Sequence, residues 1–244
     1  ACLKFPLSSI APLIYSMIEC IHCFTVILYI KGLFFLRSNM AKKHLNIINI
    51  ADSEQNSPLS IESSKKRRER ELQSKFERLW LTHPNYFDPL RDCMERERLE
   101  RTWLLLNDHV ALSKHPLAVD IGCGSGVFSR RLRDGGARVE AVDIAENALK
   151  HFRASGADNI ALKRESMPHT SLPDQQYNIV ICTEIIAEIP PQEYRLFFAE
   201  LARIINRDGF LVCSSSIDIK TVGGVERLKE LALTEFDIID EVIS

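Results

Sequence analysis

The sequence predicts a doubly wound α/β domain over residues 117–244, with a mostly parallel sheet and helices on both faces. Short apolar runs of the kind found in buried parallel strands alternate with segments whose apolar residues recur at helical spacing. A glycine-rich turn joins the first apolar run to the first helix, and an acidic residue follows the second run. Regular alternation of this kind produces a parallel sheet covered on both sides.

The elements of this domain can be assigned in order along the chain. Apolar residues of the longest expected helix recur after Pro191, which suits a first helical turn. The predicted strands are 117–121, 139–142, 160–164, 177–182, 210–214 and 236–243. The predicted helices are 127–133, 145–155, 191–205 and 225–233.

Residues 1–39 differ in composition from the rest of the chain. Residues 10–36 are almost wholly apolar and long enough to span a bilayer. Arg37, Lys42 and Lys43 would then keep the following domain in the cytoplasm. Met40 begins a stretch that looks like a translation start, so two interpretations stay open: a membrane anchor, or a segment absent from the mature protein.

Two further regions precede the α/β domain. Residues 40–63 are polar and predict a flexible leader. Residues 64–116 predict a helical cap of two helices, near 65–81 and 89–110. The basic run 65–70 is interleaved with glutamates, which favours a solvated helix face over a nucleic-acid patch.

Composition indicates a globular protein. Hydrophobic residues make up 45% of the 244 residues, charged residues make up 26%, and the formal net charge is −2. The seven cysteines include a Cys20–Cys23 pair that lacks the surroundings of a redox site. We therefore expect reduced thiols, no metal site and a cytoplasmic location, with membrane attachment through 10–36 as the alternative.

The turn after the first strand predicts a nucleoside-cofactor site. Gly122, Gly124 and Gly126 allow the backbone to approach a ligand where a Cβ would collide. The turn opens onto a helix N-terminus, whose free N–H groups attract a carboxylate or phosphate. Asp143 follows the second strand, where a carboxylate can accept hydrogen bonds from both ribose hydroxyls.

Charge distinguishes between the two cofactors that fit this turn. A dinucleotide fingerprint is G-x-G-x-x-G, whereas the spacing here is G-x-G-x-G with Asp120 two residues before it. A buried carboxylate disfavours a nearby pyrophosphate and favours an ammonium group. S-adenosylmethionine carries an amino group and no phosphate, so the sequence favours it over NAD.

The stretch Val119–Gly126 resembles motif I of class I S-adenosylmethionine-dependent methyltransferases. Residues 139–143, 172–180 and 204–211 resemble later motifs of that family in the right order, so the resemblance covers about 117–217. It implies a Rossmann-like fold and methyl transfer. The cofactor-binding residues that it implies are Asp120, Gly122, Gly124, Gly126, Asp143, Ile144, Glu165, Ser166, Met167 and Glu184.

Individual roles follow from this resemblance. The glycines would line the methionine part of the cofactor, with Asp120 facing its amino group. Residues 165–167 would contact adenine, although Ser166 stands where the family usually has an acid and Glu165 would substitute. Glu184 and Glu188 are the catalytic candidates; on a helix they would share a face. The family often has histidine at the position of Glu188. We expect His169 to be a surface loop residue.

The resemblance also implies a seventh strand that the C-terminal sequence does not supply. In this family an antiparallel strand follows strand six and lies between strands five and six, but the sequence ends near Ser244. A C-terminally truncated domain would leave an unpaired gap in the sheet.

The predicted function is methyl transfer to a small-molecule or lipid-like acceptor. An RNA or protein methyltransferase that uses the basic helix 65–70 stays open as one alternative, although nucleic acid is not favoured as a partner. A non-catalytic S-adenosylmethionine-binding module is the other alternative.

Overall fold

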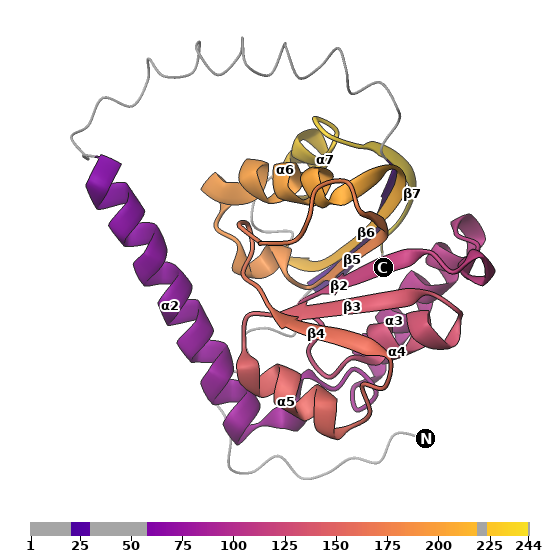
Figure 1. Cartoon of the computed structure of the whole chain (residues 1–244). Coiled ribbons are helices and arrows are strands. Elements are labelled where there is room, and N and C mark those ends of the chain that lie inside the picture. Colours follow the sequence, from indigo (N-terminus) through magenta and orange to yellow (C-terminus); the bar gives the residue numbers. More distant parts are fainter. Residues whose placement is uncertain (1–20, 30–57, 219–223, 244) are drawn as a thin grey trace.

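A computed structural model describes residues 21–29, 58–218 and 224–243 (Figure 1). Its centre is a seven-stranded sheet of order β4-β3-β2-β5-β6-β1-β7. Strands β2 to β6 run parallel to one another, while β1 runs antiparallel to both β6 and β7. The strands are β1 (Ile21–Tyr29), β2 (Leu117–Ile121), β3 (Arg138–Asp143), β4 (Ile160–Arg164), β5 (Tyr177–Thr183), β6 (Ile205–Asp218) and β7 (Asp237–Ile243).

Helices cover both faces of this sheet, which confirms the doubly wound architecture (Figure 1). One core joins alternate strand residues to α3, α4 and α5, through Leu106, Leu132 and Phe152. The other joins the opposite strand face to α6 and α7. The helices of the domain are α4 (Val127–Asp134), α5 (Glu146–Ala154), α6 (Tyr194–Ile204) and α7 (Gly224–Ala232), and the preceding ones are α2 (Pro58–Thr82) and α3 (Cys93–His109).

Strand β6 is longer than the predicted strand 210–214. It begins directly after α6, and its register against β5 shifts between Tyr177 and Ile179. The residues expected to form a turn before Phe210 are absorbed in this irregular start. A Cβ at Gly209 would lie only 2.5 Å from Ile205, so glycine permits the close packing there.

The gap expected between strands five and six is filled. β1 lies between β6 and β7 and pairs with β6 from Ile21↔Asp218 to Tyr29↔Phe210. It pairs with β7 from Phe24↔Ile243 to Tyr29↔Asp237. An unpaired gap would have left the backbone N–H and C=O groups of two strands without partners, and the N-terminal segment supplies those partners.

This pairing changes the interpretation of the apolar segment 10–36. Residues 21–29 form a strand inside the sheet, where the sequence suggested an anchor or a segment absent from the mature protein. Apolar, β-branched residues suit a central strand as well as a membrane span, so composition alone does not distinguish the two. In the described ranges, no helix combines the length and apolarity needed to cross a bilayer.

The helical cap is present, with one changed boundary. α2 begins at Pro58, inside the segment 40–63 that we expected to be a flexible leader. Proline is accepted in a first helical turn because its missing N–H has no intrahelical partner there. Residues 40–57 of that segment lie outside the described residues. α3 packs beside β1 and β6, and His109 Nε2 lies 3.1 Å from Asp240 Oδ2 of β7.

Candidate active site

The glycine-rich turn leaves the carboxyl end of β2 and is tied to the end of β3. Gly122, Gly124 and Gly126 have φ values of 70°, 51° and 77°, a region that disfavours residues with a Cβ. The N–H groups of Gly122 and Cys123 donate to the carbonyl oxygen of Val142 at 2.8 and 3.0 Å. The turn is therefore held in a fixed conformation before the first turn of α4.

Asp143 lies beside this turn and binds it directly. Its Oδ2 accepts a hydrogen bond from the Gly124 N–H at 3.0 Å, and its Oδ1 accepts one from the Ala145 N–H at 2.9 Å. Burial raises the pKa of the Asp143 carboxyl to about 6, although these backbone hydrogen bonds oppose the shift. Each oxygen keeps a second lone pair that can accept from a ligand hydroxyl.

Asp120 is buried under the turn, with a side chain from α4 as its partner. It is 2% exposed, and Ser129 Oγ donates to its Oδ2 at 2.5 Å. Burial raises the pKa of its carboxyl to about 6, and the hydrogen bond from Ser129 opposes the shift. A cationic group bound at the turn would stabilise this carboxylate in its ionised form.

Two residues of α2 lie beside this region, and sequence inspection missed both. Glu77 Oε1 and Oε2 accept the N–H groups of Glu146 and Asn147 at 2.8 and 3.0 Å, so Glu77 caps α5 from another helix. Trp80 is buried, and its indole ring would lie 3.2 Å from a Cβ placed on Gly124. The regular helical pattern of 65–81 carried no signal that Glu77 reaches the start of α5 or that Trp80 reaches the glycine-rich turn.

The cap made by Glu77 gives a testable prediction. We expect Glu77→Ala to lower the free energy of unfolding by about 1–2 kcal/mol, because two N–H groups at the start of α5 lose their acceptor. Urea denaturation measures this change. Glu71→Ala on the same helix is the control, since its pair with Arg67 is exposed and contributes little. Equal effects of the two substitutions would contradict the capping role.

Glu184 lies just past β5 in a conformation that is unusual for a non-glycine residue. Its φ is 61°, and its N–H donates to the carbonyl oxygen of Ser214 at 2.8 Å. Arg98 of α3 donates to Ser214 Oγ at 3.0 Å and lies 3.5 Å from Glu184 Oε1. The Arg98 side chain is only 10% exposed, so this corner holds a buried cation that the sequence did not identify.

Glu184 and Glu188 do not share a helical face. The backbone turns at Glu184, and Glu188 ends a short 3₁₀ segment, Ile186–Glu188. Glu188 accepts two hydrogen bonds from Lys75 Nζ of α2, at 2.9 and 2.8 Å. The left-handed residue breaks the helix that the spacing of four suggested, so the two acids face different partners.

The segment after β4 holds the other predicted residues. Glu165 accepts hydrogen bonds from the Ser171 N–H and Oγ at 2.8 and 2.6 Å and pairs with Lys163. Burial raises the pKa of the Glu165 carboxyl, but Lys163 and Ser171 outweigh it and the pKa lies below its usual value. Ser166 and Met167 face α2, and His169 is exposed, as expected of a surface loop residue.

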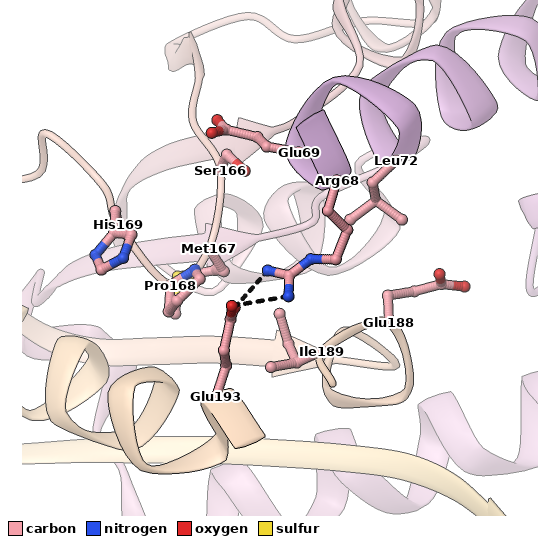
Figure 2. A pocket seen from close by; sticks show the side chains of 10 residues that line it. All are labelled: Arg68, Glu69, Leu72, Ser166, Met167, Pro168, His169, Glu188, Ile189 and Glu193. Atoms are coloured by element: carbon pink, nitrogen blue, oxygen red, sulfur yellow. Dashed lines mark hydrogen bonds and ion pairs between the residues drawn. The ribbon is translucent and has the colours of Figure 1, made fainter. Parts of the chain in front are cut away.

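A small hollow of about 40 Å³, partly open to solvent, lies between α2 and the loops after β4 and β5 (Figure 2). Arg68 crosses it and donates to both carboxylate oxygens of Glu193, so one basic residue of 65–70 is already paired inside the protein. The lining residues are Arg68, Glu69, Leu72, Ser166, Met167, Pro168, His169, Glu188, Ile189 and Glu193.

A comparison with known domains shows what this part of the chain resembles. Residues 118–209 match the family model described as a methyltransferase domain, and this range contains the glycine-rich turn, Asp120, Asp143 and Glu184. This region is therefore similar to class I S-adenosylmethionine-dependent methyltransferase domains.

Individual relatives of the methyltransferase domain are distant. The ubiquinone biosynthesis O-methyltransferase of Bordetella avium is 33% identical over 76 residues, which cover 30% of this chain and 32% of that protein. The enzyme of the same name from Stutzerimonas stutzeri is 29% identical over 126 residues, covering 48% of this chain and 51% of that protein. The chain thus matches about a third to a half of the length of these relatives.

A solved structure from Pyrococcus horikoshii OT3 is also similar to the chain. It has 27% sequence identity and a TM-score of 0.48, over 56% of this chain and 64% of that one. Within the matched region, Ile144 directly follows Asp143, is half-buried and packs against the cluster of Trp80, Ala145 and Ala148.

Proposed function

We propose that this chain binds S-adenosylmethionine at the glycine-rich turn and transfers its methyl group to a small-molecule or lipid-like acceptor. The observation that carries the proposal is the pair of buried carboxylates beside the turn, at Asp120 and Asp143. Both have pKa values of about 6, so both are ionised at neutral pH although they are buried. An amino group near one and ribose hydroxyls near the other would satisfy them.

The residues present fit this cofactor. Gly122 and Gly124 have positive φ angles, and a Cβ on either would meet a neighbouring side chain, Ile185 at 2.0 Å or Trp80 at 3.2 Å, so only glycine allows a ligand to approach the backbone there. Arg130 Nη1 donates to the Ser125 carbonyl oxygen of the turn at 2.9 Å, but the side chains buried beside the turn are the carboxylates of Asp120 and Asp143. Two buried carboxylates suit an uncharged ribose and an ammonium better than a pyrophosphate. When bound, the cofactor supplies a methyl group on a positively charged sulfur, which is a good leaving group.

The protein's own contribution would be orientation and exclusion of water. In-line displacement needs the acceptor atom about 3–3.5 Å from the methyl carbon. Trp80 covers the turn from the α2 side, and Glu184 stands at the carboxyl end of β5, held by Ser214 and Arg98. Glu184 can accept a proton where the acceptor must lose one, and Glu188 is the second candidate.

The hollow under α2 is the proposed entrance for the acceptor. Leu72, Met167, Pro168 and Ile189 give it an apolar part that an apolar acceptor would contact (Figure 2). The hollow holds only about 40 Å³, so the Arg68–Glu193 pair that crosses it would have to move for the acceptor to enter. The names of the relatives from Bordetella avium and Stutzerimonas stutzeri support this class, since both are described as acting in ubiquinone biosynthesis. The pairing of Arg68 with Glu193 leaves less positive charge for RNA on the basic helix.

The test follows both the cofactor and the acceptor. The full chain and its Asp143→Ala variant are each titrated with S-adenosylhomocysteine by calorimetry. We expect the affinity of the variant to be about 10-fold or more below that of the wild type. The protein is then incubated with S-adenosylmethionine carrying a radioactive methyl group and a cell extract. Label in the organic-soluble fraction supports the proposal, whereas label in RNA or protein overturns the acceptor class. Binding without any transfer would instead identify a non-catalytic module.

A further inference from the structure

The slot that β1 occupies is bounded by two strands that do not pair with each other. In the sheet order, β1 lies between β6 and β7, so each of these two strands pairs with β1 and not with the other. Without β1, both would present a row of backbone N–H and C=O groups without partners. The edge of β6 would be open over Phe210–Asp218, and that of β7 over Asp237–Ile243.

The occupant of the slot is remote in sequence from both walls. Residues 30–57 separate β1 from α2, and β6 begins only at Ile205. A hairpin strand is fixed by a short turn to its neighbour, but β1 has no such connection. Its place in the sheet depends on the two ladders that its backbone forms, as in a peptide that adds a strand to a sheet.

We propose that residues 21–29 act as a complementing strand: a separable peptide segment that binds the slot between β6 and β7 and completes the sheet. The slot is accordingly a peptide-binding site for an extended, antiparallel segment. The covalent connection through 30–57 serves to raise the local concentration of the segment and is not needed for the pairing itself. A chain that began at Met40 would lack the occupant.

The backbone register shows where the binding is most sensitive. Val26 is opposite Cys213 on β6 and Glu241 on β7, in the middle of both ladders. A proline at this position removes an N–H donor and its ring obstructs pairing in a central strand. A proline outside 21–29 leaves both ladders intact, so Ile48→Pro, also a β-branched residue changed to proline, is the matched control.

The experiment separates the segment from the body without removing it. A protease recognition sequence is inserted between Ala51 and Asn56 of the full chain, the purified protein is cleaved, and size-exclusion chromatography with mass spectrometry follows the N-terminal fragment. We expect the fragment to stay with the body in the wild type and in Ile48→Pro, and to separate in Val26→Pro. Release of the wild-type fragment, or its retention in Val26→Pro, would overturn the proposal.

Hydrogen exchange on the uncut wild type tests the same proposal where Val26→Pro fails to fold. The amides of residues 21–29 are expected to exchange as slowly as those of the neighbouring strand β6, because both belong to one ladder. Exchange of these amides at the rate of an unstructured peptide would contradict it. Neither readout involves cofactor or methyl transfer, so the outcome is independent of the proposed function.

Discussion

Asp120→Asn is expected to stabilise the ligand-free protein at pH 7.5 while weakening its binding of S-adenosylhomocysteine. Burial raises the pKa of the Asp120 carboxyl to about 6, so holding it ionised in the folded state costs free energy at neutral pH. Asparagine has no charge, and its side-chain oxygen can still accept the hydrogen bond from Ser129 Oγ. We expect the free energy of unfolding to rise by on the order of 2 kcal/mol.

The sign of the pH dependence follows from the same shift. Since the folded pKa of Asp120 is above its unfolded value of about 3.9, the folded state binds more protons between about pH 4 and 6. This carboxyl therefore makes the free energy of unfolding fall as the pH rises through that range, and its contribution is constant above it. Urea denaturation between pH 4.5 and 7.5 measures the difference between the wild type and Asp120→Asn, which should be largest at pH 7.5.

Binding should change in the opposite direction. The carboxylate would form a charge-assisted hydrogen bond with the ligand amino group, and its loss is expected to weaken binding about 10- to 100-fold at pH 7.5. Calorimetric titration measures this, and Asp108→Asn, at an exposed position of α3, is the control. Unchanged binding in Asp120→Asn would remove Asp120 from the site, and a lower free energy of unfolding would contradict the cost of its burial.

Gly126→Ala is the substitution expected to destabilise the fold most among those at the turn. Its φ is 77°, where an L-residue is strained by about 1–2 kcal/mol. An added Cβ would also lie 2.2 Å from two ring atoms of Phe152, a fully buried side chain. Overpacking of this kind costs a further 1–3 kcal/mol or so, and we expect a total loss of about 3 kcal/mol.

Gly156→Ala separates the two contributions. Gly156 also has a positive φ, of 104°, but nothing lies within 4 Å of an added Cβ. Its replacement should therefore show the backbone cost alone, about 1–2 kcal/mol in urea denaturation. If the two alanine variants were equally stable, packing against Phe152 would contribute nothing to the requirement for glycine at position 126.

Local sequence was enough to predict the α/β domain and its cofactor turn. Each predicted strand of the methyltransferase domain lies within an observed one or differs by a single residue, because buried parallel strands are continuous apolar runs that can be recognised one at a time. Asp120, Asp143 and the glycines of the turn were also found from local spacing. They lie at the ends of adjacent strands, β2 and β3, where parallel topology alone brings them together.

Contacts between segments remote in sequence were decided by the tertiary structure. The cap from Glu77 to α5 spans 69 residues, and the Arg98–Ser214 hydrogen bond spans 116. The place of β1 is the clearest case, since an apolar run can form a central strand or a membrane span with the same composition. Sequence by itself determined which segments are apolar, helical or able to turn; which backbone groups and charges those segments satisfy was settled only when the chain folded and brought distant partners together.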